Sequence, residues 1–167
     1  MTTTWQTQNR RSAAIRETLE RLERSRDGEL PWEQVPAARD VFGTQSELLR
    51  ALQQIWFTRL TAALDQAMEY GGTDPLETAQ MAWYELAWRF AGLRRVLDRH
   101  RDHAAVSPGR TQEHRMLAIS AGLARFDEPA VVAAARGRQL VSAHRAESRS
   151  TGWFGLLRGL RSARSVA

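Results

Sequence analysis

The stretch Phe42-Gly43-Thr44-Gln45-Ser46-Glu47-Leu48-Leu49-Arg50-Ala51-Leu52 decides the fold of this chain, because it joins a helix-start signal to the first turns of an apolar helix face. Thr44 followed by Glu47 is a capping box, in which each side chain satisfies a backbone N–H left free at the helix start. Apolar residues then recur at helical spacing to about Tyr70, where Gly71-Gly72 ends the pattern. The sequence therefore predicts a long amphipathic helix over residues 45–70.

Similar apolar periodicity marks four further segments, and no segment alternates as a strand does. Their predicted limits are Arg10 to about Gly28, Asp74 to His100 as one continuous helix, Ser107 to about Gly122, and Asp127 to Glu147. Residues 30–41 carry two prolines and are expected to form a loop with at most a short turn at its end. We expect Leu123 after the third segment, and Val131, Val132, Ala135, Leu140 and Ala143 in the last, to face inward. The prediction is an all-α fold, a bundle of about five main helices over 1–147, followed by a short amphipathic helix within a basic tail, 148–167.

The composition of the chain excludes several kinds of catalytic chemistry. The 167 residues hold no cysteine, and all 24 basic residues are arginine, which excludes thiolate and Schiff-base chemistry. Residues 136–167 hold 7 arginines against one acid, a net charge of +6, while residues 1–135 have a net charge of −1. No stretch is apolar enough to cross a bilayer, and the N-terminus lacks the pattern of a secretory signal. A cytoplasmic location is the expectation.

The Phe42–Leu52 stretch also resembles the segment that closes the DNA-binding headpiece of TetR-type transcriptional repressors and opens their connecting helix. Arg10 to Leu22 is similar to the first helix of that headpiece, so the resemblance covers residues 10–62. It implies a helical scaffold, pairing through late helices and an effector site among them. The recognition helix is missing, because only thirteen residues separate Gly28 from Phe42. Arg39 and Gln45 stand where the family has its usual phosphate-contacting tyrosine and lysine.

Aromatic side chains are concentrated in two of the predicted helices. Trp56 lies on the first, and Trp83, Tyr84, Trp88 and Phe90 lie on the second. Core packing explains such residues in most bundles, but bundles also build ligand pockets between helices. These five residues form the candidate pocket for a small apolar ligand.

The densest polar cluster is Asp98-Arg99-His100-Arg101-Asp102-His103, with His114 in the next predicted helix. A metal site is one interpretation, but the arginines would repel a cation, and basic residues near a helix C-terminus are explained by the helix dipole. We assign no metal, cofactor or catalytic residue, and since no glycine-flanked serine or phosphate-binding loop occurs, we expect no enzymatic activity.

The C-terminal tail is the best candidate for a binding element. Drawn as a helix, Trp153, Phe154, Leu156, Leu157 and Leu160 cluster on one side, with Arg158 and Arg161 beside them. Three interpretations stay open: packing on the parent domain or on a second copy, docking to another protein, and peripheral insertion of residues 153–164 at an anionic membrane.

From these observations we expect a non-enzymatic interaction or adaptor module with a regulatory role, which docks a protein partner or a second copy through residues 153–161. The alternatives are a degenerate TetR-like regulator, in which Arg39 and the tail arginines contact nucleic-acid phosphates, and a bundle that binds a small apolar ligand.

Overall fold

The chain folds into helices joined by loops in a computed structural model that describes residues 2–25, 27–70 and 72–150, with side chains from 5 to 142 in these ranges. The helices of this part are α1 (Thr2–Arg24), α2 (Pro36–Phe42), α3 (Gln45–Tyr70), α4 (Pro75–Arg89), α5 (Ala91–Arg99), α6 (Ser107–Ser120) and α7 (Ala130–Ser150). No strand occurs in the described residues, so the all-α prediction is confirmed. There are more helices than the expected five, because α2 is a full helix and the predicted helix over 74–100 is two helices.

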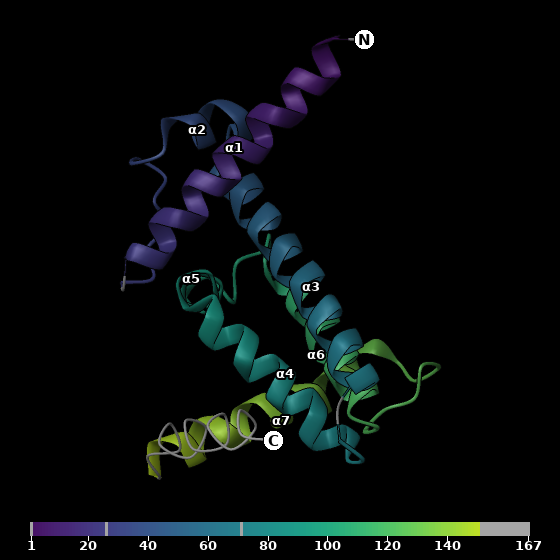
Figure 1. The fold of residues 1–167 in the computed structure, drawn as a ribbon. Coiled ribbons are helices and arrows are strands. Elements are labelled where there is room, and N and C mark those ends of the chain that lie inside the picture. The colour runs from purple at the N-terminus through teal and green to yellow at the C-terminus, as the bar shows by residue number, and fades with distance from the viewer. Residues whose placement is uncertain (1, 26, 71, 151–167) are drawn as a thin grey trace, which may run out of the picture.

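The axis of the molecule is α3, the longest helix. α1 crosses near its first turns, and α4, α5 and α6 contact it further along (Figure 1). It begins at the predicted signal, where Thr44 Oγ1 accepts the N–H of Glu47 at 3.2 Å. The predicted inward face is buried, including Leu48, Leu52, Trp56 and Leu60. The position of α3 is therefore set by its own apolar stripe.

α1 begins eight residues before the expected start at Arg10, and its first turns project beyond the rest of the molecule (Figure 1). Every side chain from Trp5 to Ala13 is exposed, whereas Ala14, Thr18 and Leu22 are buried where α1 meets the body. α2 packs beside α1 and buries Phe42, over which the guanidinium carbon of Arg11 lies at 4.6 Å.

The predicted continuous helix over 74–100 is wrong, because it breaks at Phe90 between α4 and α5. The cause lies on α1, whose Glu23 carboxylate accepts the N–H groups of Gly92 at 3.0 Å and Leu93 at 3.2 Å. Gly92 also lies against the backbone of α1, since a Cβ at that position would stand 2.0 Å from the carbonyl oxygen of Leu22. α1 thus occupies the space and takes the hydrogen bonds that a straight helix would need.

α7 packs on α6 with a face that agrees only in part with the predicted one. Val131, Val132 and Ala135 are exposed, whereas Leu140 is buried as predicted and shares the inward face with Ala133, Ala134, Gly137 and Val141. A Cβ at Gly137 would lie 1.8 Å from the His114 carbonyl oxygen, so the two helices approach closely along their small residues. Of the other two predicted inward residues, Leu123 is exposed because α6 already ends at Ser120, and the side chain of Ala143 lies outside the described ones.

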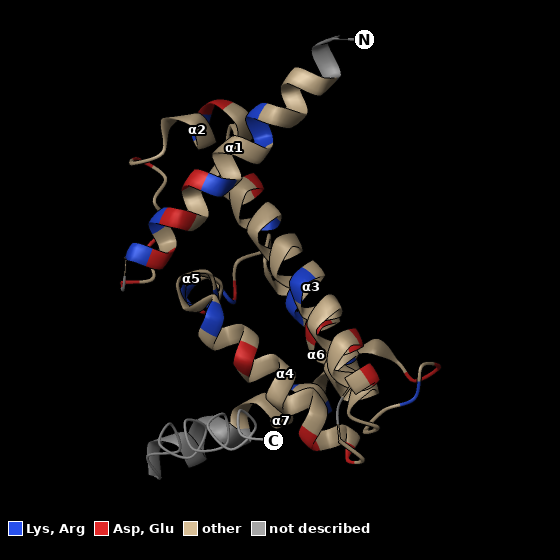
Figure 2. Cartoon of the chain, viewed as in Figure 1, with Lys and Arg blue, Asp and Glu red and all other residues tan. Residues whose placement is uncertain are grey.

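Charged residues of both signs are interspersed along α1 and are spread over the other helices (Figure 2). None of the helices in the described ranges is both long and apolar enough to span a membrane. α7 continues to Ser150, so the expected boundary between bundle and tail, at 147/148, falls inside this helix.

Candidate functional site

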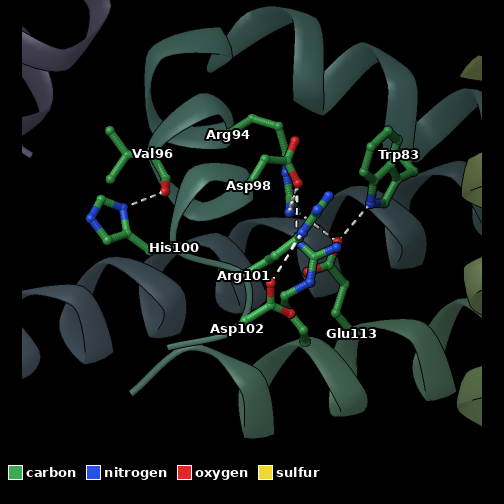
Figure 3. Close-up of polar contacts among 9 residues, drawn as sticks. Trp83, Arg94, Val96, Asp98, His100, Arg101, Asp102 and Glu113 are labelled. Carbon is green, nitrogen blue, oxygen red and sulfur yellow. Dashed lines mark hydrogen bonds and ion pairs between the residues drawn. The ribbon is translucent and has the colours of Figure 1, made fainter. Parts of the chain in front are cut away.

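The most concentrated chemistry in the described residues is a buried ion-pair network where α5 meets α6. Arg94 of α5 donates from Nη1 to Glu113 Oε1 of α6 at 2.9 Å and from Nη2 to Asp98 Oδ1 at 2.7 Å. Arg110 of α6 donates to the same Asp98 oxygen at 2.9 Å. Arg94 and Glu113 are buried, with side chains that are 7% and 1% exposed. Figure 3 shows Arg94, Asp98 and Glu113 converging between the two helices.

Two tryptophans enclose this network. The indole N–H of Trp83, on α4, donates to Glu113 Oε1 at 2.9 Å, as Figure 3 shows. The Arg94 guanidinium carbon lies 4.8 Å from the ring centre of Trp56 and 5.6 Å from that of Trp83. The two rings meet edge to face at 6.1 Å. Arg94 is therefore held by two carboxylates and by two aromatic faces, and the contacts join α3, α4, α5 and α6.

The network keeps its charges despite burial. Burial acts to raise the pKa of Glu113, but the Arg94 guanidinium and the Trp83 N–H outweigh it, and that pKa lies below its ordinary value. For Arg94, burial acts to lower the pKa, while Glu113 and Asp98 raise it above its ordinary value. Removing either partner would leave a charge in the core without compensation.

His114, next to Glu113 on α6, is buried as well. Burial lowers its pKa to about 4, and the positive charges of Arg110 and Arg138 act in the same direction, against the carboxylate of Glu113. The imidazole is consequently neutral at pH 7.

The polar cluster predicted at 98–103 does not form one site. Asp98 points to Arg94 and Arg110, whereas the His100 ring points away and its Nδ1 lies 2.9 Å from the carbonyl oxygen of Val96 (Figure 3). His103 Nδ1 accepts the N–H of Ala105 at 3.0 Å. In the described part of the chain, no three His, Asp or Glu side chains are grouped so that they could hold a metal ion.

The five aromatic residues of the candidate pocket lie in three separate places and do not line one pocket. Trp56, Trp83 and Tyr84 are brought together, with Trp83 and Tyr84 ring centres 5.1 Å apart and the Tyr84 hydroxyl donating to the carbonyl of Val141 at 3.1 Å. Trp88 is separate, with 69% of its surface exposed. Phe90 lies at the helix break under the guanidinium of Arg59, whose carbon is 3.9 Å from the ring centre.

A hollow of about 400 Å³ opens beside Phe90, between α1 and α3. Leu19 and Phe90 form its apolar lining, Arg59 reaches it from α3, and Glu20, Glu23 and Arg24 line it from α1. Burial lowers the pKa of Arg59, and its Nη1 atom is buried without a hydrogen-bond partner in the protein. Of the five candidate pocket residues, Phe90 lines this hollow.

Exposed apolar side chains occur at the start of α7. Val131 is 75% exposed and Val132 46% exposed, and Phe126, in the loop before the helix, is 78% exposed. With Ala135 one turn further on, Val131 and Val132 form a small apolar surface, which we call the outer face of α7. The predicted inward position of Val131, Val132 and Ala135 is therefore wrong.

The remaining predicted site residues are Arg39 and the docking residues of the tail. Arg39, which stands at the position of the phosphate-contacting tyrosine in the TetR resemblance, lies on α2 and pairs with Glu33 at 2.8 Å. The docking residues of the tail lie outside the described residues: Trp153, Phe154, Leu156, Leu157, Leu160, Arg158 and Arg161.

Sequence reasoning missed the pair of Arg94 and Glu113. The sequence did contain a signal. Arg94 lies one helical turn after Phe90, on the apolar side of its segment, and Glu113 lies one turn before the buried Leu117. A charged residue on an apolar face requires a partner, although the sequence alone does not name which one.

The described fold defines the class of this protein as an all-α helical bundle. Comparison of the chain with models of protein families, with curated proteins and with solved structures finds no match.

Proposed function

We propose that this chain is a protein-interaction module that binds a partner protein through its C-terminal region, that is, through the outer face of α7 and residues 148–167. The partner surface would combine apolar side chains with carboxylates. In this proposal the network around Arg94 and Glu113 has a structural role, keeping the helices of the platform in register.

The observation that carries the proposal is the burial pattern of α7. The helix packs on α6 through small residues such as Ala133 and Gly137, and turns Val131 and Val132 to solvent. Apolar side chains grouped together on an exposed surface are typical of contact sites for other molecules.

The charge of the same region supports a partner with carboxylates. Residues 136–167 contribute 7 arginines against one acid, while the rest of the chain has a net charge of −1. Complementary charge accelerates association and orients the partners.

Affinity capture from nuclease-treated native extract tests the proposal with the full chain. We expect a specific protein to be recovered with the wild type and to be lost with Val131→Ser/Val132→Ser, whereas Thr58→Ser, an exposed change on α3, retains it. The proposal fails if the double variant captures the same proteins as the wild type.

Size-exclusion chromatography with light scattering separates a foreign partner from a second copy. A purified wild-type dimer that becomes a monomer in Val131→Ser/Val132→Ser would identify the partner as another copy of this chain. Capture that disappears after nuclease treatment, or falls steeply with salt, would instead favour nucleic-acid binding.

A second candidate function is supported by the hollow beside Phe90. The hollow of about 400 Å³, where charged side chains surround the apolar Leu19 and Phe90, is within the size range of small-molecule sites. Arg59 would orient a polar end of the ligand, because its buried Nη1 atom has no hydrogen-bond partner in the protein.

Thermal unfolding with a panel of small apolar molecules tests this candidate. A ligand of the hollow should raise the Tm of the wild type and of Arg50→Ala, an exposed control on α3, but not the Tm of Arg59→Ala. A broad panel without any shift, or a shift that is equal in all three proteins, would exclude the hollow as the site.

A further inference from the structure

Five polar atoms at the junction of α3, α5 and α6 are buried without a hydrogen-bond partner in the protein. They are Gln53 Oε1, Gln53 Nε2, Trp56 Nε1, Arg94 Nε and Glu113 Oε2. Gln53 is the clearest case, because neither end of its amide is bonded and its residue is only 4% exposed. We call these four residues the polar junction.

The four side chains belong to one region of the core. Arg94 is hydrogen-bonded to Glu113, and its guanidinium carbon lies 4.8 Å from the ring centre of Trp56. Gln53 lies one turn before Trp56 on α3 and rests on Gly109, where a Cβ would stand 3.1 Å from Gln53 Nε2. Gly109 in turn lies one turn before Glu113 on α6. The unpaired amide and the unpaired carboxylate oxygen therefore come from adjacent turns of facing helices.

Leaving these atoms without hydrogen bonds would be costly. A buried donor or acceptor that loses its water and gains no partner destabilises the folded state by its full desolvation free energy. Five such atoms together would cost about as much free energy as the whole stability of a typical domain. Native proteins resolve this by binding water at such groups, usually through about three hydrogen bonds per molecule.

The kinds of atom in the polar junction identify the ligand. Gln53 Nε2, Trp56 Nε1 and Arg94 Nε are donors, and Gln53 Oε1 and Glu113 Oε2 are acceptors. An anion would be repelled by the Glu113 carboxylate, and a cation by the Arg94 guanidinium. Water both donates and accepts, and it carries no charge.

We propose that the polar junction is an internal hydration site, in which ordered water links Gln53 of α3 to the ion pair of Arg94 and Glu113. Gly109 makes the site possible, because any side chain there would collide with the Gln53 side chain, whose Cγ lies 2.4 Å from the position of a Cβ. The water extends the network of α5 and α6 to the central helix and thereby fixes the register of α3.

Nuclear magnetic resonance of the full chain tests the site. We expect dipolar cross-peaks from long-lived water to the Trp56 indole N–H and to the Gln53 side-chain amide. The exposed side-chain amide of Gln54 serves as the control and should lack them. Cross-peaks that are absent at both Gln53 and Trp56 would overturn the proposal.

Oxygen-17 relaxation dispersion of water gives a second readout, since it counts long-lived water molecules in solution. Gln53→Met keeps the length of the side chain and removes its polar atoms, so we expect at least one long-lived water fewer than in the wild type. Gln54→Met, on the neighbouring exposed position, should leave the count unchanged. Equal counts in the two variants would contradict the hydration site.

Discussion

Glu113 is the side chain on which the buried network depends, because its Oε1 atom accepts hydrogen bonds from both Arg94 and Trp83. Without this carboxylate, the Arg94 guanidinium would keep Asp98, which is partly exposed, as a partner. It would lose Glu113, its fully buried partner. A buried charge that loses its partner is among the most destabilising single changes in a protein.

We predict that Glu113→Ala lowers the free energy of unfolding by about 3–5 kcal/mol. Glu33→Ala is the matched control, because Glu33 pairs with Arg39 on the exposed surface, and its loss should change stability by less than about 1 kcal/mol. Urea unfolding followed by circular dichroism measures both. Equal losses in the two variants would show that the buried pair contributes no more than a surface pair.

His114 makes stability depend on pH in a definite direction. Its pKa is lowered to about 4 in the folded chain, so the unfolded chain binds a proton at higher pH than the folded chain does. Stability is therefore lost as pH falls from about 6.5 toward 4. Glu113, Asp27 and Glu128, whose pKa values are lowered, contribute losses only at more acidic pH.

We predict that the wild type loses about 2 kcal/mol of stability between pH 7 and pH 5 through His114. His114→Gln should flatten the curve in this range, whatever its stability at pH 7. Urea midpoints at half-unit steps of pH measure the slope. An equally steep slope in the variant would assign the proton uptake to another group.

At the scale of elements, the α4–α5 bend depends on Glu23, a residue of α1. Its carboxylate takes the place of a helix cap by accepting the N–H groups of Gly92 and Leu93. The interaction therefore ties α1 to the start of α5.

Glu23→Ala should lower the free energy of unfolding by about 1 kcal/mol, the usual loss when a helix cap is removed. Glu20→Ala, one turn earlier on α1, removes an exposed carboxylate that pairs with Arg24, and should change stability by less than half as much. Chemical unfolding of both variants measures whether the cap stabilises the bend. If Glu23→Ala leaves the free energy of unfolding unchanged, the cap does not stabilise it.

Two helix crossings depend on glycine. A Cβ would stand 2.0 Å from the Leu22 carbonyl oxygen at Gly92, and 1.8 Å from the His114 carbonyl oxygen at Gly137. We predict that Gly92→Ala and Gly137→Ala each destabilise the chain by about 1–3 kcal/mol, because the helices must separate. Gly72→Ala, at a position where a Cβ meets nothing within 4 Å, should unfold at the wild-type temperature or slightly above it. Differential scanning calorimetry of the three variants tests the close approach of the helices at these crossings. Equal unfolding temperatures in all three variants would show that the helices are less closely packed than described.

The elements also show how far the sequence could predict this structure. The start of α3 at Thr44 and that of α4 at Asp74 were predictable, because a cap and the first turn it serves are neighbours in the chain. The break at Phe90 was not, because its cause is Glu23, which is remote in sequence. The pairing of Arg94 with Glu113 was unpredictable for the same reason. The start of α7 was misjudged because close packing on α6 places Ala133, Ala134 and Gly137 inward and leaves Val131 and Val132 exposed.

At the scale of the whole molecule, a mixed-charge bundle carries a strongly basic C-terminal region. The described helices place the apolar outer face of α7 at the start of the same region. Ion pairs hold the helices of the bundle together, and the C-terminal region combines apolar and basic residues. Both features are consistent with the proposed platform that presents a binding segment.

Affinity capture with full-length variants tests this account most directly. Trp153→Ser/Leu157→Ser changes the predicted docking residues of the tail, and Trp5→Ser changes an exposed tryptophan near the other terminus. The account predicts that a protein partner is recovered with the wild type and with Trp5→Ser, resists nuclease, and is lost with Trp153→Ser/Leu157→Ser. Recovery of the same proteins with all three forms would contradict it.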